Sequence, residues 1–237
     1  LLDVTFDGVR ILNGDIVSAK PNILIRLKDE NKYLALDDTS LINVFLQYPK
    51  GNLVKMNFDN NIMTFYPPNS SNLANNNTAE IDLKPSLTED GTYKLIVQGQ
   101  DKSGNTSGDL DYKIAFEVIN KSSITNVLNY PNPFTTSTRF VFTQTGYTIP
   151  DYFKIQIMTI TGKIVKEILQ AELGNIHIGN NITEYAWDGT DEFGDRLANG
   201  VYMYRIVTKI NGEDIDYRNN NTDKYFKSGF GKMYLMK

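Results

Sequence analysis

Hydrophobic and polar residues alternate over many short stretches of the chain, as they do in β-strands that bury one face. In residues 22–28, Ile23, Ile25 and Leu27 would lie on one face, with Leu24 and Arg26 on the other. Polar turn residues separate this stretch from further strand-like runs at residues 41–48, 62–66 and 112–119. The first half of the chain is therefore predicted to be an all-β domain.

The second half repeats this organisation. In residues 152–159, Phe153, Ile155 and Ile157 alternate with Lys154 and Gln156. The other strands predicted here cover residues 138–143, 164–169, 182–187, 201–207 and 232–236. Convincing helix start and stop signals are absent. The predicted fold class is all-β, with two tandem immunoglobulin-like β-sandwich domains.

The segment Asn129-Tyr130-Pro131-Asn132-Pro133-Phe134 marks a change between the two patterns. Its alternate prolines fix φ and favour extended backbone at the residues before them, which excludes a helix and the centre of a sheet. We predict that this segment is a stiff lead-in at the entrance to the second domain. The predicted domains are residues 1–123 and 124–237.

The sequence Asp90-Gly91-Thr92-Tyr93 is typical of the tyrosine corner of immunoglobulin-like sandwiches, where the hydroxyl bonds to upstream backbone. Together with the turn at residues 101–105 and the strand that follows, it resembles the immunoglobulin-like or fibronectin-like modules of bacterial surface proteins. This pattern indicates a fold and says nothing of a ligand.

Composition narrows the range of functions. The chain has 237 residues, of which 41% are hydrophobic, 22% charged and 11% aromatic, so it is long enough and apolar enough for two cores. Its formal net charge is -4 and it has no basic run, which argues against a nucleic-acid partner. It contains no cysteine, which excludes disulfides, thiolate catalysis and cysteine-bound zinc. No apolar stretch reaches membrane-spanning length, and no signal peptide follows Leu1, so we expect a piece of a longer or processed protein.

Candidate chemistry is sparse. His177 is the single histidine, so neither a Cys-His pair nor a histidine-rich metal site can form, and we interpret it as structural. Carboxylates that could bind calcium occur at Asp188, Asp191 and Asp195 in one loop. We favour turn chemistry there, with Trp187 packed and Asp188 bonded to local backbone. Solvated turns are likewise favoured over calcium for the other acidic positions, which are Asp29, Glu30, Asp37, Asp38 and the pair Asp101 and Asn105.

The second half resembles the C-terminal sorting domain of type IX secretion cargo, whose pattern is related to the immunoglobulin-like domain of the flagellar hook-capping protein. The resemblance covers nearly all of residues 124–237 and depends on several short motifs in order. They begin with the segment containing Asn129, Pro131, Asn132, Pro133 and Phe134. Structural turns follow at Gly162, Trp187, Asp188, Gly189, Gly200 and Tyr202, and the strand Lys232-Met233-Tyr234-Leu235-Met236-Lys237 ends the chain.

The resemblance implies a non-catalytic role in delivery. It implies recognition by an outer-membrane translocon, a shuttle barrel and a sortase, and a location at the cell surface of a Gram-negative bacterium, peripheral to the outer membrane. Residues 232–237 would present backbone or side chains to such a partner. The simpler interpretation is that they only close the sandwich, and both can hold.

The chain departs from shorter family members in its long segments 144–151 and 211–230. Those extensions resemble the C-terminal ends of gingipain-type cysteine peptidases and of the sortase component, in which the domain may be retained. Cleavage in residues 120–126 is therefore left open.

Two other functions compete. An adhesin or carbohydrate-binding module would use exposed aromatics such as Tyr48, Tyr66 and Tyr93, although the corner motif gives Tyr93 a structural role. A scaffold like the hook-capping protein shares the pattern of the second half, but its chain is not expected to end in Lys-Met-Tyr-Leu-Met-Lys.

Overall fold

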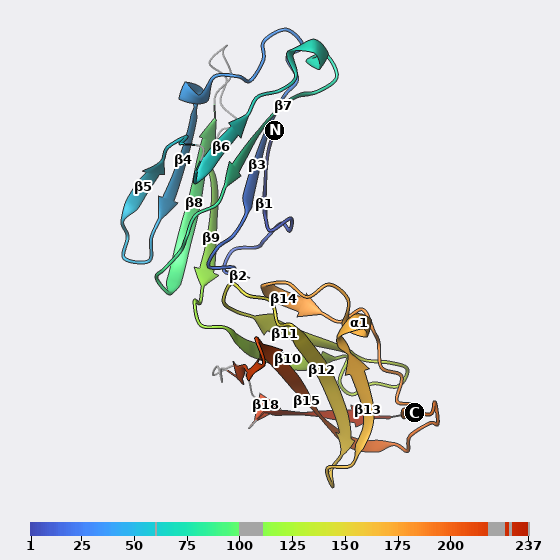
Figure 1. Ribbon diagram of the computed structural model, residues 1–237. Coiled ribbons are helices and arrows are strands. Elements are labelled where there is room, and N and C mark those ends of the chain that lie inside the picture. Colours follow the sequence, from blue (N-terminus) through green and yellow to red (C-terminus); the bar gives the residue numbers. More distant parts are fainter. Residues whose placement is uncertain (60, 100–110, 218–225, 228, 237) are drawn as a thin grey trace. The chain divides into compact units, whose positions relative to one another are not determined.

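The computed structural model describes residues 1–59, 61–99, 111–217, 226–227 and 229–236. The chain divides into two compact units, Leu1–Asn120 and Lys121–Lys237, and Figure 1 shows that arrows predominate in both. The sequence placed the boundary slightly later, between residues 123 and 124. The predicted fold class, all-β with two tandem immunoglobulin-like sandwiches, is confirmed by the four sheets.

Unit 1 contains two sheets that share one core. The first has the strand order β1-β3-β7-β6, with bounds Leu2–Phe6, Ile23–Asp29, Asn77–Leu83 and Met63–Tyr66. The second has the order β2-β9-β8-β4-β5, with bounds Ile16–Val17, Tyr112–Val118, Gly91–Gly99, Ile42–Gln47 and Leu53–Met56. Two short 3-10 turns, η1 and η2, cover Thr39–Leu41 and Ser70–Asn72.

Alternation in the sequence explains which residues fill the core of unit 1. Ile23, Ile25 and Leu27 on β3 are all buried, while Arg26 between them is exposed, as the period-two pattern predicts. Tyr93 on β8 stacks on Phe116 of β9 with the ring centroids 5.8 Å apart. The core is therefore built from the inward faces of both sheets.

Unit 2 is a second sandwich. Its smaller sheet has the order β14-β11-β10-β17, with bounds Gly179–Ile182, Arg139–Gln144, Ser123–Tyr130 and Asp216–Tyr217. Its larger sheet has the order β13-β12-β15-β19-β18, with bounds Ile164–Leu169, Tyr152–Thr159, Gly200–Ile210, Phe230–Leu235 and Phe226–Lys227, and β16 (Glu213–Asp214) also pairs with β15. A single helical turn, α1, covers Gln170–Leu173.

Each unit uses the same four-residue device to begin a strand. Asp90-Gly91-Thr92-Tyr93 leads into β8, and Asn199-Gly200-Val201-Tyr202 leads into β15. The hydroxyl of Tyr93 donates to the carbonyl of Glu89 at 3.0 Å, and that of Tyr202 donates to the carbonyl of Ala198 at 2.8 Å. Both bonds reach four residues upstream, so each tyrosine fastens a corner of its sandwich.

Several predicted elements of unit 2 differ from the structure. The segment 129–134 is not a lead-in to the domain, because β10 already belongs to unit 2 and runs through Tyr130. The strand predicted at 182–187 is wrong beyond Ile182, since only an isolated bridge joins Trp187 to Thr138. The prediction of no helix missed α1, which is one turn long. Within residues 211–230, β17 pairs in parallel with β10.

No helix among the described residues has the length and the apolar character that crossing a membrane requires.

Candidate functional site

The C-terminal strand β19 has one buried face and one exposed face. Gly231, Met233 and Leu235 are buried, and the last two are 0% and 1% exposed. Lys232 is exposed, Tyr234 is 40% exposed and Met236, just after the strand, is 55% exposed. The strand thus closes the sandwich with one set of side chains and presents the other set to solvent. Lys237 lies outside the described residues.

One edge of β19 pairs antiparallel with β15, with Tyr202 opposite Met233 and Gly200 opposite Leu235. Along residues 232–236 the other edge is occupied by the segment 132–134. The amide nitrogen of Asn132 donates to the carbonyl of Lys232, and its amide oxygen accepts from the backbone N–H of Tyr234, both at 3.0 Å. The side chain of Asn132 therefore takes the place of a neighbouring strand.

Phe134 continues this edge with its backbone. Its N–H donates to the carbonyl of Tyr234 at 3.0 Å, and its carbonyl accepts from the N–H of Met236 at 2.9 Å. Its ring is 2% exposed and lies 5.5 Å from the ring of Trp187. The segments 132–134 and 232–236, far apart in sequence, are thus joined by four hydrogen bonds.

The segment before Phe134 is held by a small polar cluster. The amide nitrogen of Asn129 donates to Thr138 Oγ1 at 3.0 Å and to the carbonyl of Pro131 at 3.3 Å, and Thr138 Oγ1 donates to that same carbonyl at 2.8 Å. The peptide bonds before Pro131 and Pro133 are both cis. Asn129 is buried beneath the turn, so its side chain serves to position the segment rather than to contact solvent.

The predicted structural turns have identifiable contacts. Trp187 is 0% exposed, and its Nε1 donates to the carbonyl of Thr190 at 2.8 Å. Asp188 Oδ1 accepts from the N–H and the hydroxyl of Thr190 at 3.1 and 2.7 Å. Gly162 has a φ of 87°, which an L side chain rarely adopts, and it lies in the turn between β12 and β13. Gly189 has a φ of 79° in the turn after Asp188.

Gly231 is required by close packing. It lies opposite Tyr204 on β15, and a Cβ added to it would be 2.0 Å from Tyr204 Cζ. The ring of Tyr204 therefore covers the glycine, is only 1% exposed, and contacts Phe140 with the ring centroids 5.0 Å apart. Burial raises the pKa of the Tyr204 hydroxyl, and a hydrogen bond with the Asn129 backbone opposes that rise.

A groove of about 700 Å³ lies beside β19 and the segment 132–133 in unit 2. Its walls come from β10, from the segment 132–133, from β15 and from β19. Its lining residues are Leu128, Asn129, Tyr130, Asn132, Pro133, Met203, Tyr204, Phe230, Gly231, Lys232 and Tyr234. Tyr130 is 68% exposed, so the groove has an aromatic rim. We refer to it below as the terminal groove.

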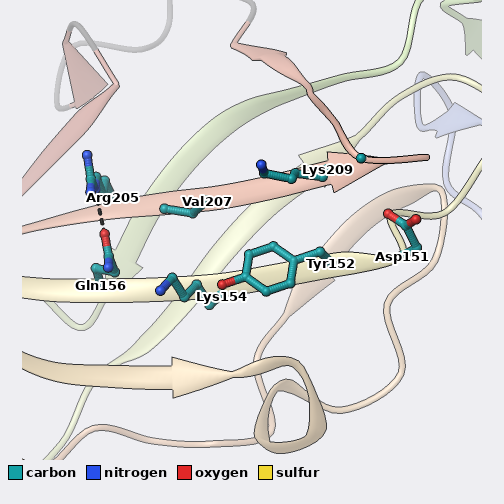
Figure 2. Close-up of a pocket in the computed structure, with 8 residues that line it drawn as sticks. Asp151, Tyr152, Lys154, Gln156, Arg205, Val207 and Lys209 are labelled. Atoms are coloured by element: carbon teal, nitrogen blue, oxygen red, sulfur yellow. Dashed lines mark hydrogen bonds between the residues drawn. The ribbon is translucent and has the colours of Figure 1, made fainter.

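A second hollow, of about 540 Å³, lies over one face of the paired strands β12 and β15 (Figure 2). Its cations have partners: Lys154 pairs with Glu167 at 2.8 Å and Lys209 with Asp214 at 3.6 Å. Arg205 Nε donates to Gln156 Oε1 at 2.6 Å, and Figure 2 shows the two side chains joined across the two strands. Because the charged side chains of this hollow are already paired within the chain, we propose no ligand for it.

The candidate calcium ligands that the structure describes take part in local turn hydrogen bonds. Asp191 Oδ1 accepts from the N–H groups of Phe193 and Asp195, each at 2.9 Å, so it shapes its own loop. No group of three histidine, aspartate or glutamate side chains suited to a metal occurs in the part of the chain that the structure describes. Asp38 and Asp29 accept from the N–H groups of Ser40 and Asn31 in local turns. The pair Asp101 and Asn105 lies outside the described residues.

The three aromatic residues considered for an adhesive surface of unit 1 differ in exposure. Tyr93 is 0% exposed, Tyr48 is half-buried and packs against it with the ring centroids 5.3 Å apart, and Tyr66 is 52% exposed. His177 is half-buried, and its backbone N–H and carbonyl both bond to the side chain of Asn181.

Sequence analysis missed the contribution of β10 and β15 to this site. Leu128 and Tyr130 are exposed at alternate positions on β10, but this alternation covers only the last four residues of the strand, after its register shift. The contact between Tyr204 and Gly231 joins two strands and has no local signature.

No family model matches the chain, and no curated protein matches it. Among solved structures it is similar to latent PorU from Porphyromonas gingivalis, with 17% identity and a TM-score of 0.36 over 99% of this chain. It is also similar to a tetra-tandem repeat of a large adhesion protein (14%, TM-score 0.32, over 99% of this chain). A third is the C-terminal domain of the antigen I/II-family protein AspA of Streptococcus pyogenes (8%, TM-score 0.30), where the match covers 100% of this chain and 99% of that one. The chain spans 20% of the PorU chain and 49% of the adhesion protein chain, so the activities of those whole proteins are not carried over to it.

Proposed function

We propose that unit 2 is a non-catalytic sorting domain that directs a larger protein through the type IX secretion system to the cell surface. Its C-terminal strand is the element that the secretion machinery reads. The proposed partners are the outer-membrane translocon, the shuttle barrel and the sortase, and the proposed location is the outer face of a Gram-negative outer membrane.

The observation that supports this proposal is that β19 has one buried face and one exposed face. Met233 and Leu235 are buried and hold the strand in place, while Lys232, Tyr234 and Met236 are exposed beside one another on the other face. A rigidly held strand that displays a cation, an aromatic ring and an adaptable thioether is suited to recognition by side chains.

The hydrogen bonds along the edge of β19 limit how a partner can recognise the strand. Asn132 and Phe134 already bond to the backbone of residues 232, 234 and 236, so a partner strand cannot add to that edge while they are in place. In the folded domain, recognition therefore falls to the exposed side chains and not to the backbone.

A display experiment tests this function. Residues 1–237 are fused behind a reporter with a signal peptide and expressed in a bacterium with a type IX system. The test variant replaces Lys232, Tyr234 and Met236 with Ser, which spares the buried face of β19. The matched control also introduces Ser, at Lys163, Phe193 and Ile160. These residues are an exposed cation, an exposed ring and an exposed aliphatic side chain elsewhere in unit 2.

We expect surface display of the unmodified fusion and of the control variant, with the test variant held in the periplasm. Failure of the unmodified fusion to reach the surface would overturn the sorting role. Display of the test variant at the control level would show that the machinery does not read this strand.

A further inference from the structure

The walls of the terminal groove are apolar and aromatic. Leu128 and Tyr130 project from β10 with 38% and 68% of their surface exposed, and the exposed ring of Pro133 continues this wall. Met203 and Tyr234 contribute from the other side. A volume of about 700 Å³ is in the range of ligand-binding pockets, which is about 300–1,000 Å³.

The charge of the groove has one sign. Among the described residues that line it there is no aspartate or glutamate, and the one ionised group is the ammonium of Lys232. That ammonium lies 5.3 Å from the ring centroid of Tyr234 and has no ion pair among the residues that the structure describes. Lys232 is exposed, so its ammonium, held over an aromatic face, is accessible to a carboxylate of a ligand.

The amide groups of the groove are already engaged. Asn132 uses its amide nitrogen and oxygen on β19, and the amide nitrogen of Asn129 is bonded to Pro131 and Thr138. The amide oxygen of Asn129 has no partner among the described residues, but it is buried and out of reach of a solute. Apart from tyrosine hydroxyls, little remains to bond the many hydroxyls of a sugar, so the groove favours an apolar ligand over a carbohydrate.

We propose that the terminal groove binds an extended segment of a partner protein in which a carboxylate is flanked by apolar side chains. The carboxylate contacts Lys232, and the apolar side chains pack on Tyr130, Pro133 and Tyr234. Aromatic-lined grooves are a recurring surface for extended segments that do not add to a sheet. The inference rests on the proposed function, because the groove shares Lys232 and Tyr234 with the exposed face of β19.

A peptide array tests the proposal without any secretion machinery. The full chain, fluorescently labelled, is applied to immobilised octapeptides with a central Glu flanked by Pro, Leu, Phe or Tyr. Matched arrays carry Gln or Lys in place of the Glu. We expect Glu peptides to be retained about three- to tenfold more strongly than Gln peptides, in line with one charge-assisted contact.

Three variants locate the binding. Lys232→Glu should reverse the preference toward Lys peptides, and Tyr130→Ser or Tyr234→Ser should abolish retention. Lys163→Glu and Ile160→Ser, at exposed positions outside the groove, should leave it unchanged. Thermal unfolding of each variant verifies that these surface changes leave the fold intact.

The proposal is overturned if no peptide is retained above background, or if Lys232→Glu keeps the preference for Glu. It is also overturned if a parallel glycan array shows binding that Tyr130→Ser removes while the peptides remain unbound. The outcome is separable from the sorting role. Selective peptide binding together with failed surface display would retain the groove and reject the sorting signal, and the reverse combination would reject only the groove.

Discussion

The side-chain oxygen of Asn132 accepts a hydrogen bond from the backbone N–H of Tyr234 at 3.0 Å, across 102 positions of sequence. The nitrogen of the same amide donates to the carbonyl of Lys232 at 3.0 Å. An amide side chain can do this because it offers one donor and one acceptor, as a peptide group does. Together with the backbone of Phe134, this one side chain closes an edge that would otherwise be open to strand addition.

Asn132→Asp should therefore destabilise unit 2 in a pH-dependent way. The carboxylate can still accept from Tyr234, but it cannot donate to the carbonyl of Lys232 and instead faces it, so the expected cost is about 1–3 kcal/mol at neutral pH. Protonation restores a donor, so the deficit relative to the unmodified chain should shrink as the pH falls below about 4. Denaturant unfolding followed by the fluorescence of Trp187, the single tryptophan, measures this in unit 2. Asn175→Asp at an exposed position is the control, and an equal, pH-independent loss in both variants would contradict the explanation.

Gly231→Ala should be severely destabilising, because the new Cβ would lie 2.0 Å from Tyr204 Cζ and 2.4 Å from its hydroxyl oxygen. Overpacking of this kind costs about 1–3 kcal/mol and sometimes more. Tyr204→Leu removes the ring from that position and carries its own cavity cost. The double variant should be less destabilised than the sum of the two single variants by about 1 kcal/mol or more, since the clash disappears. Additive losses would show that the ring does not lie over Gly231.

Alkaline pH should weaken unit 2 through Tyr204. Burial raises the pKa of its hydroxyl above the ordinary value of 10.0, so the neutral form is favoured by folding. The resulting stability is complete below about pH 10 and is lost as the pH rises toward the folded-state pKa. Tyr204→Phe should lower stability at pH 8, where it loses a hydrogen bond, yet flatten its decline between pH 10 and 11.5. Tyr130→Phe, at a position 68% exposed, should keep the original slope. Identical slopes in all three proteins would contradict this account.

Local patterns in the sequence predicted much of the fold but not how the site is assembled. The alternation in residues 23–27 and 153–157 gave the correct buried faces because one side chain in two points to the core in a regular strand. Strand β10 escaped notice because its register shifts between Thr125 and Leu128, where Asn126 has a φ of 53°, and the alternation begins only after that bulge. The bonds between Asn132 and β19 join residues about a hundred positions apart, and no local pattern contains them.

Calcium should have no effect on the stability of unit 2. The loop that contains Asp188, Asp191 and Asp195 is held by hydrogen bonds within the chain, and Asp191 Oδ1 accepts two of them at 2.9 Å. Asp191→Ala should cost about 1–2 kcal/mol through the loss of these bonds, equally in millimolar calcium and in chelator. Thermal unfolding under both conditions measures it. A rise in the melting temperature of the unmodified chain with calcium, absent in Asp191→Ala, would instead assign a metal to this loop.

The paired tyrosine corners allow each unit to be weakened separately. Tyr93→Phe removes the bond to Glu89 in unit 1, and Tyr202→Phe removes the bond to Ala198 in unit 2, at an expected cost of about 1 kcal/mol each. Because Trp187 belongs to unit 2, Tyr202→Phe should shift the unfolding transition seen by tryptophan fluorescence, and Tyr93→Phe should leave it in place. Circular dichroism, which reports on both units, should shift in both variants. If Tyr93→Phe moved the fluorescence transition by the same amount, the two sandwiches would unfold together in one cooperative transition. That result would contradict the expectation that each corner bond stabilises only its own sandwich.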